Sequence, residues 1–148
     1  MPHYKFRFNL SALVLFLLIM VPNLYWFAVP APQDVLRSPS VTETLDTAAS
    51  VFQALMVAAL CLIRAIPGPR LRLTPLIGAT LAALVLYLAA WISYYGGATT
   101  PLVLLTLCIA PCLSFLFYAI DRRNFPALVP TALFTVCHLI YVIANYLI

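Results

Sequence analysis

The sequence predicts an all-α, polytopic membrane protein, a bundle of five transmembrane helices with almost no soluble part. Composition is the first observation behind this prediction, because 65% of the 148 residues are hydrophobic and 8% are charged, with a mean hydropathy of +1.06. A soluble domain carries about 25% charged residues. The second observation is a series of apolar stretches of about 20 residues, the length that crosses the hydrocarbon core of a bilayer. The third is the sidedness of the basic residues between those stretches.

The first span is predicted at residues 9–29, a stretch without a charged side chain. Pro22 interrupts it, and because proline removes a backbone hydrogen bond we expect a kink there. Asn23 is suited either to bond a freed carbonyl or to face a ligand. A secretory signal peptide is the alternative interpretation, since Lys5 and Arg7 precede the apolar run. The length of the run and the bulky aromatic group that ends it favour a retained helix.

Residues 30–46 are expected to form the external loop, because three prolines and several polar residues interrupt the apolar pattern. Ser40 and Glu43 have the spacing of a capping box, which predicts that helical structure starts near Val41. The apolar part of the second span is predicted at residues 47–66.

The second helix is expected to carry a polar face that includes Asp46 and Gln53. The carboxylate of Asp46 is explained by its place near a helix start, where it favours the helix dipole and is solvated. Gln53 lies about 10 Å deeper, because a helix rises about 1.5 Å per residue. At that depth an amide needs a polar partner.

The third and fourth spans are predicted at residues 73–95 and 101–120. The third is rich in alanine and contains Gly78, and such small residues allow close contact between helices. Pro101 suits the first position of a helix, whereas Pro111, in the middle of the fourth span, predicts a kink.

The fifth span, residues 126–148, is apolar almost throughout, yet it carries His138, Tyr141 and Asn145 on one face. A strongly polar residue inside a span must face the bundle or a wet cavity, because lipid offers it no partner. This face is therefore expected to point inward.

The basic residues predict the orientation of the chain. If the five spans alternate, seven of the eight lysines and arginines fall on one side of the membrane, and only Arg37 falls on the other. Cytoplasmic loops are enriched in basic residues, so the amino terminus is expected inside and the carboxyl terminus outside. The bases form short clusters between apolar runs rather than one patch, which argues against a nucleic-acid partner.

In this orientation the polar residues of the spans converge on the outer half of the bundle. The sequence predicts an outward-facing polar pocket, and its hypothetical ligand-binding residues are Asn23, Asp46, Gln53, His138, Tyr141 and Asn145. The same groups are also suited to hold helices together, since interhelical hydrogen bonds contribute about 0.6 kcal/mol each without any ligand. No acid lies deep in a span, which disfavours proton-coupled transport by this chain alone.

Metal binding and catalysis find less support. Cys108 and Cys112 share a helix face, and Cys137 and His138 lie on the next helix, but Pro111 distorts the turn between the two thiols. Cys137 and His138 are neighbours in sequence, so a helix prevents them from facing each other, and no hydrolase or metalloprotease motif is present. We expect no metal, no cofactor and no catalytic residue, and we expect the cysteines to be packed free thiols.

One group of proteins has a similar pattern. Asn9 followed by an apolar run into Ile19-Met-Val-Pro-Asn-Leu-Tyr25, then a short polar loop and a histidine late in the last span, resembles a group of small, uncharacterised bacterial multi-pass membrane proteins. The resemblance is best over the first helix. It implies a place in the bacterial cytoplasmic (inner) membrane and implies that the Pro22-Asn23 break and His138 are family features, but it implies no activity or substrate.

These observations predict a small multi-pass protein, a single membrane domain over residues 1–148. It is expected to act through helix association in the lipid bilayer, as a homo-oligomer or as the membrane subunit of a larger assembly. One alternative is a binder or transporter of a small polar or lipid-like solute through the outer pocket. The other is a membrane-embedded enzyme acting on lipid head groups, which is less favoured because only Tyr141 and Asp46 could supply a second titratable group beside His138.

Overall fold

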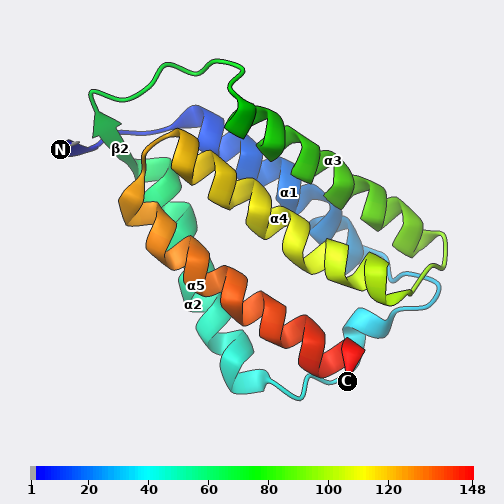
Figure 1. Ribbon diagram of the computed structural model, residues 1–148. Helices are drawn as coiled ribbons and strands as arrows, with labels where there is room; N and C mark the ends of the chain where they lie inside the picture. The colour runs from blue at the N-terminus through cyan, green and yellow to red at the C-terminus, as the bar shows by residue number, and fades with distance from the viewer. Residues whose placement is uncertain (1–2) are drawn as a thin grey trace.

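The computed structural model describes residues 3–148, and over this range the chain folds into an all-α bundle (Figure 1). Within the described residues, five helices are long and apolar enough to cross a membrane, which confirms the predicted fold class. They are α1 (Leu10–Ala28), α2 (Glu43–Leu62), α3 (Pro75–Tyr95), α4 (Pro101–Asp121) and α5 (Phe125–Val142), and α5 continues as a π-helical turn, Ile143–Leu147.

The helices α1, α3, α4 and α5 start with the same local feature. A polar side chain before the first turn accepts a hydrogen bond from the amide of the third helical residue, which satisfies one of the donors that a helix start leaves free. Proline stands in the first turn of α3, α4 and α5, where its missing amide costs nothing. The capping residues are Asn9, Thr74, Thr100 and Asn124.

The start of α2 differs from the prediction, because Ser40 and Glu43 do not form a capping box. The helix begins at Glu43, and Thr42 stands before it without capping it through its side chain. The Ser40 hydroxyl accepts a hydrogen bond from the Thr42 amide at 3.1 Å, and the Thr42 hydroxyl donates to the Asp46 carboxylate at 2.9 Å. The turn before α2 therefore orients Asp46 instead of capping the helix.

The end of α2 also differs, because the helix stops at Leu62 and does not reach Ile66. The next residues form strand β2 (Ile63–Ile66), which pairs antiparallel with β1 (His3–Phe6). Just after β1, the backbone amides of Arg7 and Asn9 donate to carbonyls of the last turn of α2. The start of the chain thus supplies partners for carbonyls that a helix end leaves unpaired.

Successive helices run in opposite directions, so the bundle has two ends. The sheet end carries β1, β2 and the α4–α5 turn, and the loop end carries residues 29–42 and the α3–α4 turn. The helix α4 is the most buried one in the described part of the chain and packs against α3 and α5, while α2 packs against α5. Figure 1 shows α4 and α5 converging toward the sheet end and separating toward the loop end.

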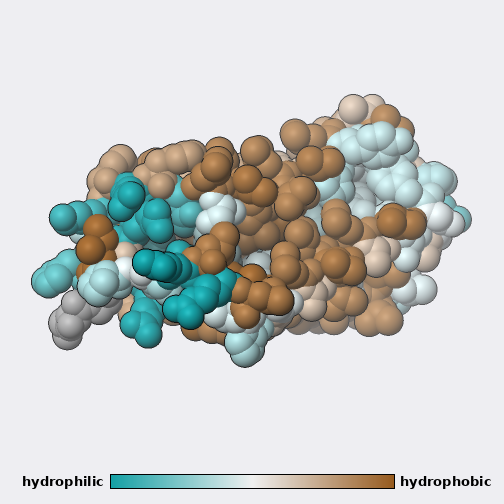
Figure 2. Space-filling view, turned by 90° about the horizontal axis from the view of Figure 1, so that it is seen from above, coloured by the Kyte–Doolittle hydropathy of each residue, from teal (hydrophilic) through white to brown (hydrophobic). Residues whose placement is uncertain are grey.

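The surface is divided into an apolar middle and two polar ends (Figure 2). Strongly hydrophilic side chains gather at the sheet end and weakly polar ones at the loop end. Large apolar side chains between them, such as Leu17 and Leu24 of α1 and Val85 and Ile92 of α3, point out of the bundle. A continuous apolar surface of this kind suits hydrocarbon rather than water. The chain is accordingly a multi-pass membrane protein.

The helix α1 continues through Pro22 as one α-helix. Tyr87 of α3 reaches this point, where its hydroxyl donates to the Ile19 carbonyl at 3.0 Å and accepts from the Asn23 side-chain amide at 2.8 Å. Asn23 also donates to the Ile19 carbonyl at 3.2 Å. The turn before the proline is therefore stabilised by a polar contact between α1 and α3.

Candidate functional site

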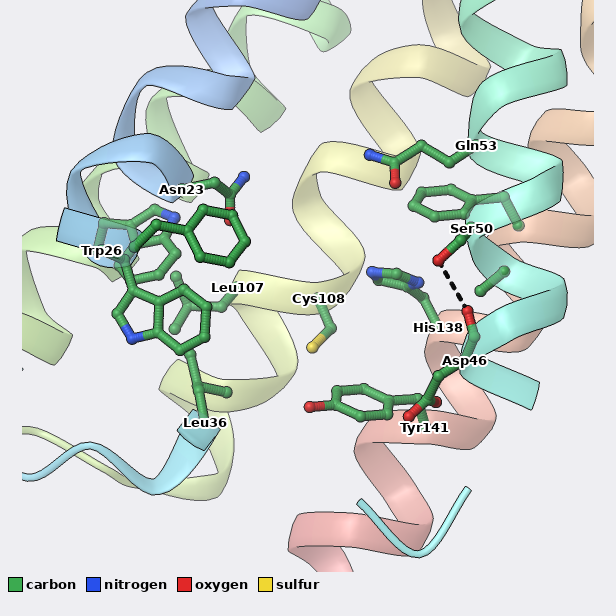
Figure 3. Close-up of a pocket in the computed structure, with 14 residues that line it drawn as sticks. Asn23, Trp26, Leu36, Asp46, Ser50, Gln53, Leu107, Cys108, His138 and Tyr141 are labelled. Atoms are coloured by element: carbon green, nitrogen blue, oxygen red, sulfur yellow. Dashed lines mark hydrogen bonds between the residues drawn. The ribbon is translucent and has the colours of Figure 1, made fainter. Parts of the chain in front are cut away.

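A cavity of about 410 Å³ lies between the helices in the half of the bundle nearer the loop end (Figure 3). Each of α1 to α5 contributes to its lining, together with Leu36 from the loop before α2. The lining includes Asn23, Asp46, Gln53, His138 and Tyr141, so the fold brings together five of the six side chains that the sequence singles out.

One wall of the cavity is polar and comes from α2 and α5. We call it the polar wall and define it as Asp46, Ser50, Gln53, His138 and Tyr141. Figure 3 shows the rings of His138 and Tyr141 pointing from α5 toward α4, with Gln53, Ser50 and Asp46 along α2 beside them. The Ser50 hydroxyl is occupied by the Asp46 backbone carbonyl at 3.0 Å, and the Tyr141 hydroxyl lies 2.8 Å from that of Tyr146.

The remaining groups of the polar wall are largely free. Within the described residues the side-chain amide of Gln53 makes no hydrogen bond. In the same part of the chain, Asp46 Oδ1 accepts from the Thr42 hydroxyl, and Oδ2 has no hydrogen-bond partner. His138 Nδ1 is buried and finds no partner in residues 3–148. Leaving buried polar atoms unpaired costs about 1–3 kcal/mol each. A buried unpaired atom such as His138 Nδ1, retained beside a cavity, is typical of a site that binds a polar group.

The opposite wall is aromatic and apolar. We call it the aromatic wall and define it as Trp26 and Phe27 of α1, Trp91 of α3, and Leu107 and Cys108 of α4. The ring centroids of Trp26 and Trp91 are 6.4 Å apart, a distance at which aromatic side chains attract each other. The cavity is therefore amphipathic: the polar wall faces aromatic rings, with Asn23 of α1 on the side of Trp26 and Phe134 of α5 on the side of His138.

The loop before α2 holds Trp26 in this wall through Asp34, a contact that the sequence did not predict. Trp26 Nε1 donates to both carboxylate oxygens of Asp34, at 2.9 and 3.0 Å. The Tyr94 hydroxyl donates to the same carboxylate at 2.8 Å, Arg37 Nε at 2.7 Å, and the Ala31 amide at 3.2 Å. Asp34 thus joins the ends of α1 and α3 to the loop that closes the cavity.

These contacts determine the charge state of Asp34. Burial by itself would raise the pKa of the carboxyl, because it disfavours the charged form. The hydrogen bonds from Trp26, Tyr94, Arg37 and Ala31 favour the carboxylate and together outweigh burial, so they hold the pKa below its ordinary value of 3.8. Asp34 is therefore a carboxylate at neutral pH.

Asn145 lies outside the lining of the cavity. Its side-chain oxygen accepts from the Val41 amide at 2.9 Å, and its nitrogen donates to the Thr42 hydroxyl at 3.0 Å and to the Tyr141 carbonyl at 2.9 Å. The residue ties the turn before α2 to the end of α5. Its contacts are those of a structural residue, whereas its place on the same helix face as His138 predicted a place in the pocket.

The cysteines Cys61, Cys108, Cys112 and Cys137 are all buried and unbridged. The Cys112 thiol donates to the Cys108 carbonyl of the preceding turn. Across residues 3–148, no group of three or more histidine, cysteine or acidic side chains is placed to hold a metal ion. The cavity is accordingly best described by its polar and aromatic walls.

Comparisons with protein-family models, with curated proteins and with solved structures found no match for this chain.

Proposed function

We propose that this protein binds a small amphipathic solute in the intramembrane cavity and that a positively charged solute fits best. The observation that carries the proposal is a set of polar atoms without partners among the described residues, Asp46 Oδ2, the Gln53 amide and the buried His138 Nδ1, which face aromatic rings across the cavity. Ligand sites in proteins typically combine apolar walls with a few convergent polar groups in about 300–1,000 Å³. The volume here is at the lower end of that range, which favours a small ligand.

The charge of the lining supports a cation. The described residues that line the cavity include one acid, Asp46, and no lysine or arginine. A carboxylate partly removed from water attracts a cation and repels an anion. Aromatic faces such as those of Trp26, Trp91 and Phe134 add favourable cation–π contacts. The nearby Arg37 guanidinium, 4.6 Å from the Trp26 ring centroid, already makes such a contact outside the cavity.

The cavity is proposed to open toward the outside of the cell. With the sheet end in the cytoplasm of a bacterial cell and the loop end outside, the cavity lies in the outer half of the membrane. A solute would then reach it from the external medium or from the outer leaflet. Phe27, which is 65% exposed and lines the cavity, marks a side at which the lining meets the surface of the bundle.

The test uses three probes of the same shape and different charge: benzyltrimethylammonium, neutral neopentylbenzene, and phenylmethanesulfonate. A ligand that binds the folded state raises the unfolding midpoint of the detergent-purified protein by mass action. The cation should give the largest shift and the anion the smallest. Gln53→Ala should weaken the response to the cation.

Asp46→Asn should remove the preference for the cation over the neutral probe. Glu43→Gln is the matched control, because Glu43 is an exposed acid in the same first turn of α2 and lies outside the lining. Equal shifts for the three probes would refute the charge preference. The absence of any shift would refute solute binding.

A second candidate function is self-association through α3. Gly78, Ala82, Ala89 and Ser93 lie on its outer side at helical spacing, and a side chain at Gly78 would meet nothing within 4 Å. Small residues at such spacing allow two helices to approach closely in lipid. Ala82→Leu should weaken energy transfer between labelled copies in vesicles, and Ala58→Leu on the exposed side of α2 should not. Energy transfer unchanged by Ala82→Leu would exclude this face.

A further inference from the structure

The sheet end concentrates positive charge. Seven of the eight basic residues of the chain lie there, in β1, the segment between β1 and α1, β2, the loop after β2 and the α4–α5 turn, and Figure 2 shows the resulting hydrophilic cap. Asp121 is the one acidic residue among the described residues of this end. Its carboxylate accepts a hydrogen bond from the Thr74 hydroxyl, and a carboxylate oxygen lies 3.8 Å from a guanidinium nitrogen of Arg122. Within residues 3–148 the other bases of this end have no acidic partner.

The small sheet places two like charges side by side. Lys5 of β1 stands directly opposite Arg64 of β2. Like charges in that position destabilise a strand pair unless a counter-charge is present. Side chains alternate along a strand, so Tyr4 and Phe6 point to the other face from Lys5. The strand β1 therefore has a basic face and an aromatic face.

The aromatic face of β1 continues into a groove on the outside of the bundle. The groove has a volume of about 430 Å³ and lies between the end of α2 and the start of α5. Its lining is apolar and includes Phe6, Phe52, Leu55, Pro126 and Leu133. Phe6 is 82% exposed. Most of its surface is therefore available to contact a further apolar group in the groove.

A basic residue lies in the turn that precedes Pro126, one of the groove residues. Arg123 is exposed in the α4–α5 turn, next to the start of α5. The Tyr4 hydroxyl donates to the Arg123 carbonyl at 3.4 Å, which links the aromatic face of β1 to this turn. An exposed arginine thus lies in the turn that leads directly into Pro126, which lines the groove.

We propose that this groove is a binding site for an anionic phospholipid, with an acyl chain along α2 and α5 and the phosphate near Arg123. Basic residues at the ends of transmembrane helices attract the head groups of anionic lipids. The groove adds a place for the chain, which a bare field of charge does not provide. This site is separate from the intramembrane cavity and does not depend on the function proposed for it.

The experiment measures unfolding midpoints of the protein in an uncharged detergent with dioleoylphosphatidylglycerol or dioleoylphosphatidylcholine at equal molar ratio. The two lipids share their chains and differ in head-group charge. The anionic lipid should raise the midpoint by at least twice as much as the zwitterionic lipid. Inorganic phosphate alone should not reproduce the shift, because it cannot occupy the groove.

Two arginine variants separate a site from a general field of charge. Arg123→Gln should lose at least half of the difference between the two lipids, whereas Arg70→Gln should keep it, since Arg70 is exposed and lies outside the groove. Each midpoint is referred to that of the same variant without lipid, so a loss of stability does not affect the comparison. Native mass spectrometry of retained lipid gives a second measurement for each variant.

Three results would overturn the proposal. Equal shifts with the two lipids would show that charge is not recognised. Equal losses in Arg123→Gln and Arg70→Gln would assign the preference to diffuse attraction. A phosphate effect as large as that of the anionic lipid would indicate an anion site without a chain-binding groove. Phe6→Ala provides a further check, because it should reduce the shift caused by either lipid.

Discussion

Among the acids of the described residues, Asp34 accepts the most hydrogen bonds. It lies where the loop before α2 meets the ends of α1 and α3. Its side chain is 10% exposed. Hydrogen bonds to a charged group contribute about 1.5–3 kcal/mol each before the cost of burial. A single loop residue therefore holds the aromatic wall of the cavity in place through Trp26.

This arrangement predicts a pH dependence of stability. The pKa of Asp34 is lower in the folded than in the unfolded state, so its contribution is complete above the unfolded value, near 3.8, and is lost as pH falls through the folded value. Stability in detergent should fall by about 1–3 kcal/mol more in the wild type than in Asp34→Asn on acidification from about pH 5 to below pH 3. Chemical unfolding at each pH, followed by tryptophan fluorescence, measures this difference. Parallel pH profiles for the two proteins would contradict the prediction.

At the scale of the element, α1 shows how a proline is accommodated inside a membrane helix. Pro22 supplies no amide to the turn before it, and lipid supplies no substitute donor. The carbonyl that loses its helical donor is that of Leu18. The structure brings two polar groups to the neighbouring Ile19 carbonyl: the Asn23 side-chain amide from the same helix, and the hydroxyl of Tyr87, which is 2% exposed. The contact that stabilises the interrupted turn also joins α1 to α3.

Tyr87→Phe should therefore destabilise the protein by about 1 kcal/mol, within the range measured for interhelical hydrogen bonds in membranes. The change removes the hydroxyl and leaves the ring that packs against Trp91. Tyr25→Phe is the control, because Tyr25 is 54% exposed on the same part of α1. Unfolding midpoints in mild detergent measure both variants. Equal midpoints for Tyr87→Phe and wild type would show that the contact contributes nothing.

At the scale of the whole molecule, the charged residues divide the bundle into a basic sheet end and a loop end that carries Asp34, Glu43 and Asp46 with Arg37. Cytoplasmic segments are enriched in basic residues because their translocation is disfavoured. The alternation of helix direction places the basic clusters of the described residues, other than Arg37, at the same end. The charge pattern therefore predicts a cytoplasmic sheet end.

Cysteine labelling in intact bacterial cells tests this orientation. Ser38 and Arg70 are exposed at the loop end and the sheet end, while the native cysteines are buried. A membrane-impermeant maleimide should label Ser38→Cys in intact cells and Arg70→Cys only after permeabilisation. The reverse pattern would contradict the predicted orientation. If both variants were labelled in intact cells, α2, the helix between these two positions, would not cross the membrane.

The predictable part of the candidate site follows from helix geometry. His138 and Tyr141 share a helix face at any packing, and so do Asp46 and Gln53, because the period of the helix determines which side chains lie together. Lipid requires such faces to turn inward, so the convergence of α2 and α5 on one cavity could be expected. Asn145 lies outside the cavity lining because a helix face specifies direction but not the partner that it meets, which here is the turn at Thr42.

The sequence by itself determined the number of membrane-spanning helices and the polar residues that face inward, because apolar length and helical period are local properties of the chain. Only the tertiary structure decided the early end of α2, the contact of Tyr87 with the Pro22 turn and the role of Asp34. Each of these depends on groups far apart in the sequence: β1 pairs with β2, α3 reaches α1, and the loop meets the ends of two helices. Such contacts arise from packing, and a pattern within one segment does not contain them.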